Sequence, residues 1–316
     1  MKLDKQMLER LSGRDCLCLT QFSQDELLFL LEFSTYIKKK TLNREVYHPL
    51  AEKTLGMIFH KPSTRTRVSF EVGMVQLGGH PLFLSANEMQ LGRGETIADT
   101  AQTLSRYLDG IMIRTFSHET VEQLAEAASI PVINGLTDLL HPCQILADLL
   151  TIQEKKGRLQ GLKMTYIGDG NNVAHSLMTG CAMVGMDIYV VTPMGYEPDI
   201  AIFNQAEEIA FDTGAKVFIG NEAKEAAPGS DVLYTDVWAS MGQENEAEEK
   251  IKLFKGYQLN SELLKMAKKD ALVMHCLPAH RGEEITAEVL DGPNSVIFDQ
   301  AENRLHAQKG LLAALL

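Results

Sequence analysis

The chain has 316 residues, 45% of them hydrophobic, which predicts a soluble globular protein of two domains, each large enough for its own core. Thirty basic and 42 acidic residues give a formal net charge of −12, which argues against nucleic acid or an anionic membrane as a partner. No run of about 18 uncharged apolar residues occurs, and the first residues lack the apolar core of a signal peptide. We therefore expect a cytoplasmic protein.

The cysteines give no sign of a cross-linked or metal-bound scaffold. They are an odd number with no repeated spacing: Cys16, Cys18, Cys143, Cys181 and Cys276. Disulfides are rare in a reducing compartment, and no second Cys or His pair lies at ligand spacing from the first two cysteines. Buried or unreactive thiols are expected, and no structural zinc.

Apolar runs typical of strands alternate with amphipathic helical segments, a pattern that predicts parallel sheets flanked by helices. Two helices, near 4–12 and 24–39, come first. Strands are expected near 54–59, 81–85, 110–115 and 131–135, and then near 163–168, 187–192, 216–219, 232–236, 271–276 and 295–299. A last helix is expected over about 300–315, and the polar segment 153–158 is the candidate domain hinge.

Residues 63–67 read Ser-Thr-Arg-Thr-Arg and stand between the first predicted strand and a predicted helix. Arg65 and Arg67 would oppose the macrodipole in the first helical turn, at a cost of about 0.3 to 1 kcal/mol each unless an anion compensates. Backbone N–H groups, hydroxyls and guanidinium groups at one point predict a phosphate site. The alternative is that Ser63 or Thr64 only caps the helix, with the arginines in solvent.

A second motif, His141-Pro142-Cys143-Gln144, follows another predicted strand and opens another helix. A proline at a helix start is common in itself, so the motif gains its meaning from the others. Together with 63–67, Arg114, the segment 236–242 and the segment 275–278, it follows the motif order of the transcarbamylases. The chain resembles the ornithine carbamoyltransferases of the aspartate/ornithine transcarbamylase superfamily over essentially its whole length.

The resemblance implies an α/β fold of two domains, each a parallel β-sheet flanked by helices, with the active site in the interdomain cleft. Residues 1–150 would bind carbamoyl phosphate and residues 151–299 ornithine, with the final helix, about 300–316, packing back on the first domain. The implied reaction transfers the carbamoyl group of carbamoyl phosphate to the δ-amino group of L-ornithine, giving L-citrulline and phosphate. No cofactor or metal is implied, and a homotrimer with shared active sites is expected.

Matching the family's motifs residue by residue assigns the site. The carbamoyl-phosphate-binding residues would be Ser63, Thr64, Arg65, Thr66, Gln90, Arg114, His141, Pro142, Cys143, Gln144, Cys276, Leu277 and Arg304. The catalytic residues would be Arg114, His141 and Cys276, and the ornithine-binding residues Asn172, Asp236, Ser240 and Met241. In such families the loop that carries Gln90 enters the neighbouring subunit's site.

Several of these assignments keep an alternative. Arg67 either contacts the ligand or forms a structural ion pair, for which Glu95 is the candidate partner. Arg304 could instead pair with Glu302 at the surface. Asp236 could be a loop cap, and Cys276 a small core residue.

Residues 168–172, Gly-Asp-Gly-Asn-Asn, look like part of a dinucleotide fingerprint. Val173 replaces its third glycine, which weakens close approach to a pyrophosphate, so dinucleotide binding is not expected.

The identity of the acceptor and the direction of the reaction are separate questions. Putrescine, aspartate and N-acetylornithine are the competing acceptors within the superfamily. The carboxylate of Asp236 calls for an ammonium group, and the segment 236–242 lacks the tyrosine of the putrescine enzymes. A binding protein that keeps the fold without turnover is the alternative from another class. Arginine biosynthesis and, in reverse, the arginine deiminase pathway would use the same residues.

Overall fold

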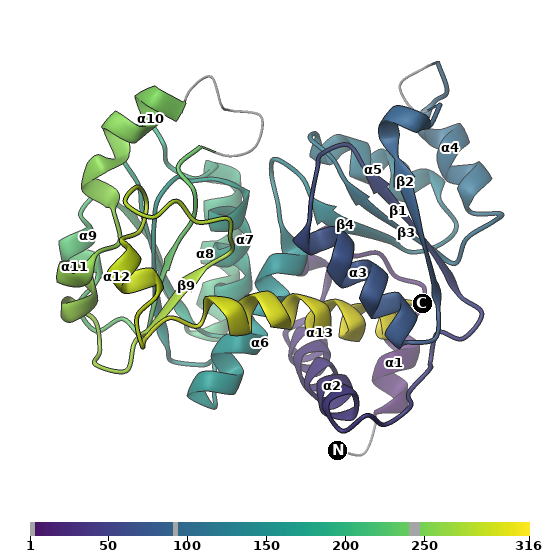
Figure 1. The fold of residues 1–316 in the computed structure, drawn as a ribbon, viewed down its shortest axis with the longest axis horizontal. Coiled ribbons are helices and arrows are strands. Elements are labelled where there is room, and N and C mark those ends of the chain that lie inside the picture. The colour runs from purple at the N-terminus through teal and green to yellow at the C-terminus, as the bar shows by residue number, and fades with distance from the viewer. Residues whose placement is uncertain (1–3, 91–93, 240–246) are drawn as a thin grey trace. The chain divides into compact units, whose positions relative to one another are not determined.

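The computed structural model describes residues 4–90, 94–239 and 247–316, and the chain divides into two compact units (Figure 1). Unit 1 comprises Met1–Leu150 and Glu302–Leu316, and unit 2 comprises Thr151–Ala301. The chain passes from unit 1 to unit 2 within helix α6 and returns within helix α13. No helix in the described part of the chain combines the length and the apolar character needed to span a bilayer.

Unit 1 holds a four-stranded parallel sheet in the order β2-β1-β3-β4. Its elements, in chain order, are α1 (Lys5–Leu11), η1 (Leu19–Gln21), α2 (Gln24–Leu42), β1 (Thr54–Phe59), α3 (Arg65–Gln76), β2 (His80–Ser85), η2 (Ala86–Glu88), α4 (Ile97–Leu104), β3 (Gly110–Arg114), α5 (His118–Ala127), β4 (Val132–Leu136) and α6 (Pro142–Lys156). α13 (Ile297–Leu315) closes the unit.

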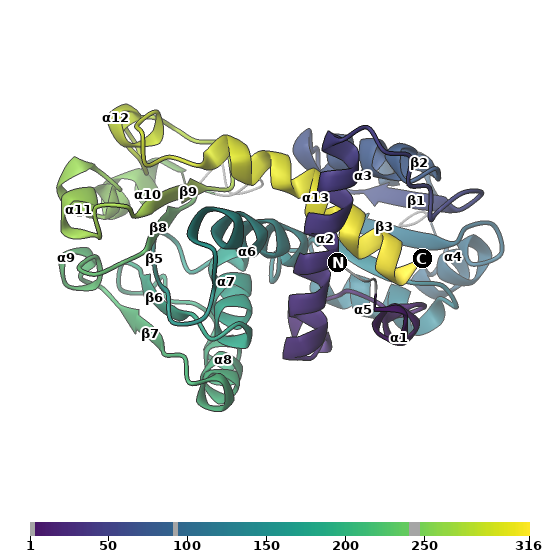
Figure 2. The ribbon, with the colours of Figure 1, turned by 90° about the horizontal axis from the view of Figure 1, so that it is seen from below.

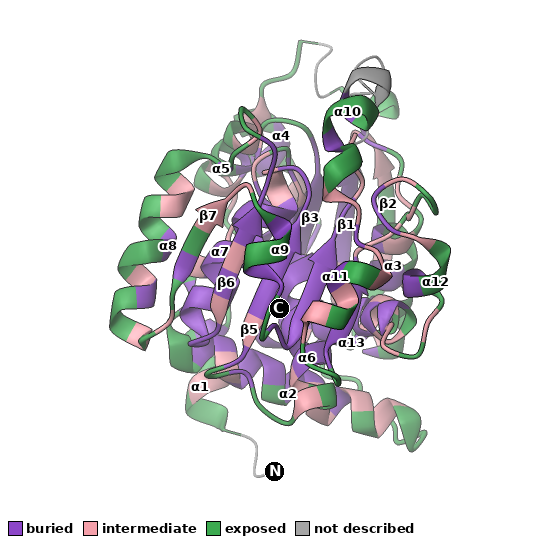
Figure 3. Cartoon of the chain, turned by 90° about the vertical axis from the view of Figure 1, so that its left-hand side faces the viewer, coloured by how far each residue is buried: buried purple, intermediate pink, exposed green. Residues whose placement is uncertain are grey.

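The strands of this sheet read as continuous apolar runs because helices cover the sheet and leave little alternation between faces. Every residue of β3 is buried, as is β1 after its first residue (Figure 3). β2, at the edge, is more exposed. A cluster that includes Ile58, Ile111, Val121 and Leu124 joins β1 and β3 to α4 and α5.

Local signals set the ends of several helices. The Ser23 hydroxyl accepts a hydrogen bond from the N–H of Glu26, and the Glu26 carboxylate accepts one from the N–H of Ser23, so both groups at the start of α2 are satisfied. Asn171 caps α7 in a similar way, because its side-chain oxygen accepts from the N–H groups of Val173 and Ala174.

Unit 2 holds a five-stranded parallel sheet in the order β7-β6-β5-β8-β9, which can be followed in Figure 2. Helices α7 and α8 lie on one face, and α9 and α11 on the other (Figures 1 and 2). The elements are β5 (Lys163–Ile167), α7 (Asn172–Met183), β6 (Asp187–Val191), α8 (Ile200–Thr213), β7 (Val217–Gly220), α9 (Ala223–Ala226), β8 (Val232–Thr235), α10 (Ala247–Phe254), η4 (Lys255–Tyr257), α11 (Ser261–Met266), β9 (Leu272–His275) and α12 (Ala287–Leu290).

The fold class of two parallel α/β domains flanked by helices is confirmed, with one difference among the strands. The strand expected near 295–299 does not form. Ser295 makes only an isolated bridge to Val273, and α13 begins at Ile297. Of the apolar residues 296–298, Ile297 and Phe298 are the first two of this helix, and a run this short has no periodicity that separates strand from helix. The interdomain position of the active site stays a prediction.

Helices α2 and α13 of unit 1 pack closely at a glycine. A Cβ at Gly310 would lie 2.0 Å from Ser34 Oγ and 3.0 Å from Ser34 Cα, so a side chain fits only if α2 moves. Beside this contact, the ammonium of Lys309 donates to Thr41 Oγ1 and Gln76 Oε1, and the ammonium of Lys38 donates to Asn303 Oδ1.

We predict that Gly310→Ala lowers the melting temperature by several degrees, because overpacking of this kind typically costs about 1 to 3 kcal/mol. Gly256→Ala is the matched control, since a Cβ at Gly256 meets no atom within 4 Å. Thermal unfolding of the two variants and the parent chain, followed by scanning calorimetry, provides the measurement. Equal melting temperatures for the two variants would contradict the packing.

Candidate active site

The predicted site residues of each unit follow the carboxyl ends of its parallel strands. In unit 1, residues 63–66 come after β1, Arg114 ends β3, and His141 follows β4. In unit 2, Asp236 follows β8 and Cys276 follows β9. Parallel strands place their carboxyl ends along one edge of a sheet, where α/β proteins bind their ligands.

The Ser-Thr-Arg-Thr-Arg motif lies at the N-terminus of a helix, as expected. α3 begins at Arg65, and the hydroxyl of Ser63 accepts a hydrogen bond from the N–H of Thr66. Thr64 occupies the cap position without a side-chain capping bond. The first turn contains no acidic residue, and Glu71, in the next turn, pairs with Arg67.

Arg304 of α13 connects this turn to the second motif of unit 1. Its guanidinium donates to Gln144 Oε1 at 2.6 Å and to Thr66 Oγ1 at 3.1 Å, and the side chain is buried. The amide of Gln144 donates in turn to Asp148 Oδ1 at 2.8 Å. Arg304 is 160 positions from Gln144 and 238 positions from Thr66 in the sequence, yet the three side chains share one polar network. The alternative of a surface ion pair between Arg304 and Glu302 is wrong, because Arg304 is buried.

His141 of unit 1 is buried, and three arginine charges act on it. Burial holds its pKa well below the usual value, and the positive charges of Arg304, Arg114 and Arg65 lower the pKa further. The imidazole is therefore neutral near pH 7 and has one N–H to donate. Three guanidinium groups close enough to perturb one imidazole create a positive potential that favours an anion.

The neighbours of His141 in its motif have structural surroundings. Pro142 is the first residue of α6, where its missing N–H costs nothing. The thiol of Cys143 donates to the carbonyl oxygen of Asn134 at 3.4 Å, and burial raises the pKa of Cys143 to about 12. Cys143 is thus a protonated, buried thiol rather than a nucleophile.

Two further residues of unit 1 that the sequence singled out, Arg67 and Gln90, are exposed. Arg67 is exposed, forms an ion pair with Glu71 at 3.0 Å and stacks over the ring of Phe83 at 3.8 Å. The structural ion pair expected as one alternative therefore forms, but with Glu71 as its partner, whereas Glu95 accepts a hydrogen bond from Thr100. Gln90 follows η2 and is exposed to solvent.

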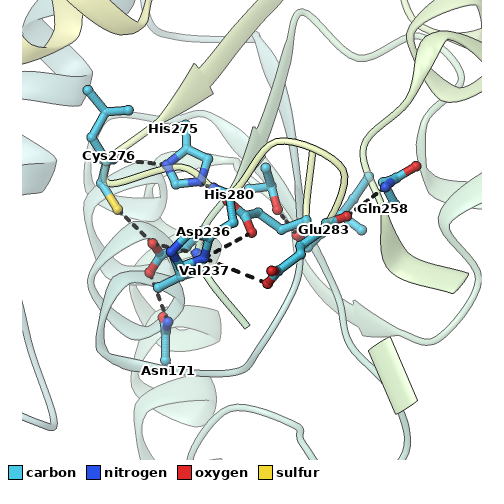
Figure 4. A network of polar contacts seen from close by, with 12 residues as sticks. Asn171, Asp236, Val237, Gln258, His275, Cys276, His280 and Glu283 are labelled. Atoms are coloured by element: carbon cyan, nitrogen blue, oxygen red, sulfur yellow. Dashed lines mark hydrogen bonds and ion pairs between the residues drawn. The ribbon is translucent and has the colours of Figure 1, made fainter. Parts of the chain in front are cut away.

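In unit 2 the carboxylate of Asp236 lies at the centre of a polar group (Figure 4). Its Oδ1 accepts from the thiol of Cys276 at 2.9 Å and from the N–H of Val237 at 2.8 Å. Its Oδ2 accepts from the amide of Asn171 at 2.9 Å. The sequence assignment named the next residue, Asn172, which opens α7, and its role in ornithine binding stays a prediction.

The segment after Cys276 is held by a buried pair that the motif assignment did not include. Leu277 has φ of 60°, a left-handed conformation that is uncommon for leucine, and its N–H donates to His275 Nδ1 at 2.9 Å. His275 Nε2 therefore carries the proton and donates to Glu284 Oε1 at 2.9 Å. Burial raises the pKa of Glu284, but the hydrogen bonds from His275 and from the His280 N–H outweigh it and leave the pKa lowered.

A second contact beside Asp236 was also missed. The buried ammonium of Lys250, on α10, donates to Asp169 Oδ2 at 2.7 Å. Burial raises the pKa of Asp169, and the Lys250 charge opposes this shift. The sequence carries no spacing signal for either contact, because 81 positions separate Lys250 from Asp169. Ser240 and Met241 lie outside the described residues.

Two family models together match most of the chain. The carbamoyl-P binding domain of the aspartate/ornithine carbamoyltransferases matches residues 14–154, and their Asp/Orn binding domain matches residues 160–315. The first range contains His141 with Arg65 and Arg114, and the second contains Asp236, Cys276 and Arg304.

Individual proteins are similar over nearly the full length. The ornithine carbamoyltransferase of Anoxybacillus flavithermus is 60% identical over 97% of this chain and 98% of its own. A Pyrococcus furiosus relative named as an anabolic ornithine carbamoyltransferase is 55% identical over 98% of each chain.

Solved structures give the same result. The ornithine carbamoyltransferase structure from Pyrococcus furiosus has a TM-score of 0.94 at 55% identity and covers 96% of this chain and 97% of its own. The structure from Gloeobacter violaceus has a TM-score of 0.86 at 51% identity, with 96% and 99% coverage. The chain belongs to the aspartate/ornithine carbamoyltransferase family.

Proposed function

We propose that this chain transfers the carbamoyl group of carbamoyl phosphate to the δ-amine of L-ornithine, giving L-citrulline and phosphate. The observation that carries the proposal is the approach of Arg65, Arg114 and Arg304 to a buried, neutral His141. All of these except Arg304 lie within the range that matches a carbamoyl-P binding domain. The relatives at 55 to 60% identity, all named ornithine carbamoyltransferases, support ornithine as the acceptor.

Unit 1 has the chemistry that carbamoyl phosphate requires. Its phosphoryl group is dianionic, and the guanidinium of Arg65, with the N–H groups at the start of α3, suits that charge. Ser63, Thr64 and Thr66 add hydroxyl groups at the same helix end. Phosphate binding would also offset the unfavourable position of the arginines in the first turn.

The carbonyl end of carbamoyl phosphate gains negative charge when an amine attacks it. Donors that are already in place lower the energy of that charge without further rearrangement. Arg114 supplies a fixed cation, and neutral His141 supplies one N–H. The side-chain oxygen of Gln144 already accepts from Arg304, so this arrangement holds its amide in a defined orientation.

Unit 2 has groups that suit an amino-acid acceptor. Asp236 offers a carboxylate to an ammonium group, and Cys276 and Leu277 stand next to it. We assign Cys276 to positioning the δ-amine. In the structure its thiol donates a hydrogen bond to Asp236. The amine itself is the nucleophile, and covalent catalysis by Cys276 is not part of the proposal.

The balance of the reaction is simple. The δ-nitrogen forms a bond to the carbamoyl carbon, and the bond from that carbon to the phosphate oxygen breaks. The amine loses a proton from a normal pKa of about 10 before or during attack. Departing phosphate is the final proton acceptor in the proposal. The same steps in reverse would release ornithine and carbamoyl phosphate from citrulline and phosphate.

We also propose a homo-oligomer, with a trimer as the expected state. On α3, Val68, Val72 and Val75 are 51%, 36% and 61% exposed, an apolar stripe at helical spacing that a partner surface would cover. Leu82 and Phe83, on the edge strand β2, are exposed as well. A second copy of the chain would bury this apolar set and bring its own residues close to the N-terminus of α3.

A cytoplasmic location is part of the proposal. All five cysteines are free, and three of them, Cys16, Cys143 and Cys181, are fully buried. Free thiols are stable in a reducing compartment. The small-molecule substrates would be carbamoyl phosphate and ornithine.

We predict that the purified chain forms citrulline and phosphate in equal amounts from carbamoyl phosphate and ornithine. Putrescine, aspartate and N-acetylornithine, tested under the same conditions, should give far slower phosphate release. Putrescine lacks an acceptor carboxylate, aspartate carries a second one, and N-acetylation removes the ammonium that Asp236 would bind. If any of these three compounds were carbamoylated faster than ornithine, it would replace ornithine as the proposed acceptor. Absence of phosphate release with all four compounds would overturn the proposed activity.

If Gln90 acts across a subunit interface, each site takes Arg65 from one chain and Gln90 from the next around a closed ring. Arg65→Ala and Gln90→Ala should then each be impaired alone and regain activity when dissociated, mixed and reassembled. Random mixing in equal amounts leaves roughly a quarter of the sites with both residues intact. Mass spectrometry of the mixed oligomers verifies assembly. Verified hybrids without recovered activity would exclude a shared site.

A further inference from the structure

We propose that His280, Glu283 and Glu284, in the loop between β9 and α12 of unit 2, bind a divalent transition-metal ion. Each offers one ligand atom, and the three atoms lie within 4.8 Å of one another. The residues belong to one short segment within one unit, so the geometry depends on local structure only. Figure 4 shows His280 and Glu283 directed toward each other.

The separations suit an ion better than direct contact. His280 Nδ1 lies 3.7 Å from Glu283 Oε2 and 3.8 Å from Glu284 Oε2, beyond hydrogen-bond distance. A point among three atoms at such spacing is about 2.1 to 2.4 Å from each, within the range of metal–ligand bonds to nitrogen and oxygen. No backbone movement is needed for the three atoms to reach an ion at that point.

Glu284 supplies an independent reason for a ligand. Its side chain is fully buried, and Oε1 already accepts from His275 Nε2 and from the His280 N–H, at 2.9 and 2.6 Å. Oε2, in contrast, has no hydrogen-bond partner among the described residues. Leaving a buried carboxylate oxygen without a hydrogen-bond partner costs free energy. The cluster places His280 and Glu283 beside Glu284, and an ion held among the three would be a ligand for this oxygen.

The donor set indicates the class of ion. One imidazole nitrogen and two carboxylate oxygens suit Mn²⁺, Co²⁺ or Zn²⁺. Mg²⁺ and Ca²⁺ are usually bound by oxygen ligands alone. The side chains of His280 and Glu283 are 53% and 43% exposed, so water can complete the coordination and the ion can enter from solvent. The hydrogen bond from His275 holds Glu284 in orientation, as outer partners of metal ligands commonly do.

This cluster differs from the acceptor group beside it. Asp236, His275 and Cys276 also lie within 4.8 Å of one another, but they include a thiol and are assigned above to ornithine. Thiol-containing sites favour soft ions, so Mn²⁺, which prefers oxygen ligands, distinguishes the two clusters. The competing explanation is that the loop holds these three side chains in place without an ion.

The test is Mn²⁺ binding to the purified, metal-free full chain, followed by the loss of the electron paramagnetic resonance signal of aqueous Mn²⁺. One ion per chain should bind, and His280→Ala and Glu283→Gln should each weaken binding by at least about tenfold. Both side chains are substantially exposed, and circular dichroism checks the fold of each variant. Glu262→Gln is the control, since Glu262 is an exposed glutamate of the same unit, paired with Lys224.

Cys276→Ala should leave Mn²⁺ binding unchanged. Loss of binding in Cys276→Ala, or equal binding by the parent, His280→Ala and Glu283→Gln, would place the ion elsewhere and overturn the proposal. No binding at millimolar Mn²⁺ would mean that the loop holds the three side chains together without an ion, and would also overturn the proposal. The readout does not involve turnover, so this result and the failure of the proposed carbamoyl transfer are distinguishable.

Discussion

The structure of unit 1 depends on holding several arginine side chains close to one buried imidazole. Arg65, Arg114 and Arg304 all lower the pKa of His141, which burial has already lowered. Arg304 also donates to Gln144 and Thr66 and thereby joins the last helix to the starts of α6 and α3. Positive charge concentrated in this way is unfavourable for an isolated protein and favourable once an anion binds. The same arrangement explains why His141 would act as a neutral donor rather than as an acid.

Unit 2 has the opposite character. Asp236 is a buried carboxylate that accepts from Cys276, Asn171 and the backbone of Val237. Behind it, Glu284 fixes His275, and His275 fixes the N–H of Leu277. In the proposed function, one unit therefore binds the phosphorylated group and the other the ammonium group. That division corresponds to the two domain models that match the chain.

Apolar runs in the sequence predicted most strands of both sheets. Strands of a parallel sheet that helices cover on both faces are apolar along their whole length, so they stand out in the sequence. The strand predicted at 295–299 was wrong, because Ile297 and Phe298 start a helix there. Motifs placed the candidate residues at strand ends, since those motifs are local. The distant pair of Lys250 with Asp169 was missed, and Arg304 was grouped with Gln144 and Thr66 only through the resemblance to a family. No residue pattern encodes such pairs without the fold that brings them together.

The central claim is that unit 1 binds the phosphorylated substrate through charge, while Asp236 acts on the acceptor alone. Calorimetric titration of carbamoyl phosphate into the parent chain, Arg65→Ala and Asp236→Asn tests this division most directly. Loss of a buried, charge-assisted phosphate contact costs about 2 to 4 kcal/mol, so Arg65→Ala should bind roughly 30-fold more weakly or worse. Asp236→Asn should bind like the parent. Equal affinity of Arg65→Ala and the parent, or equal losses in both variants, would contradict the account.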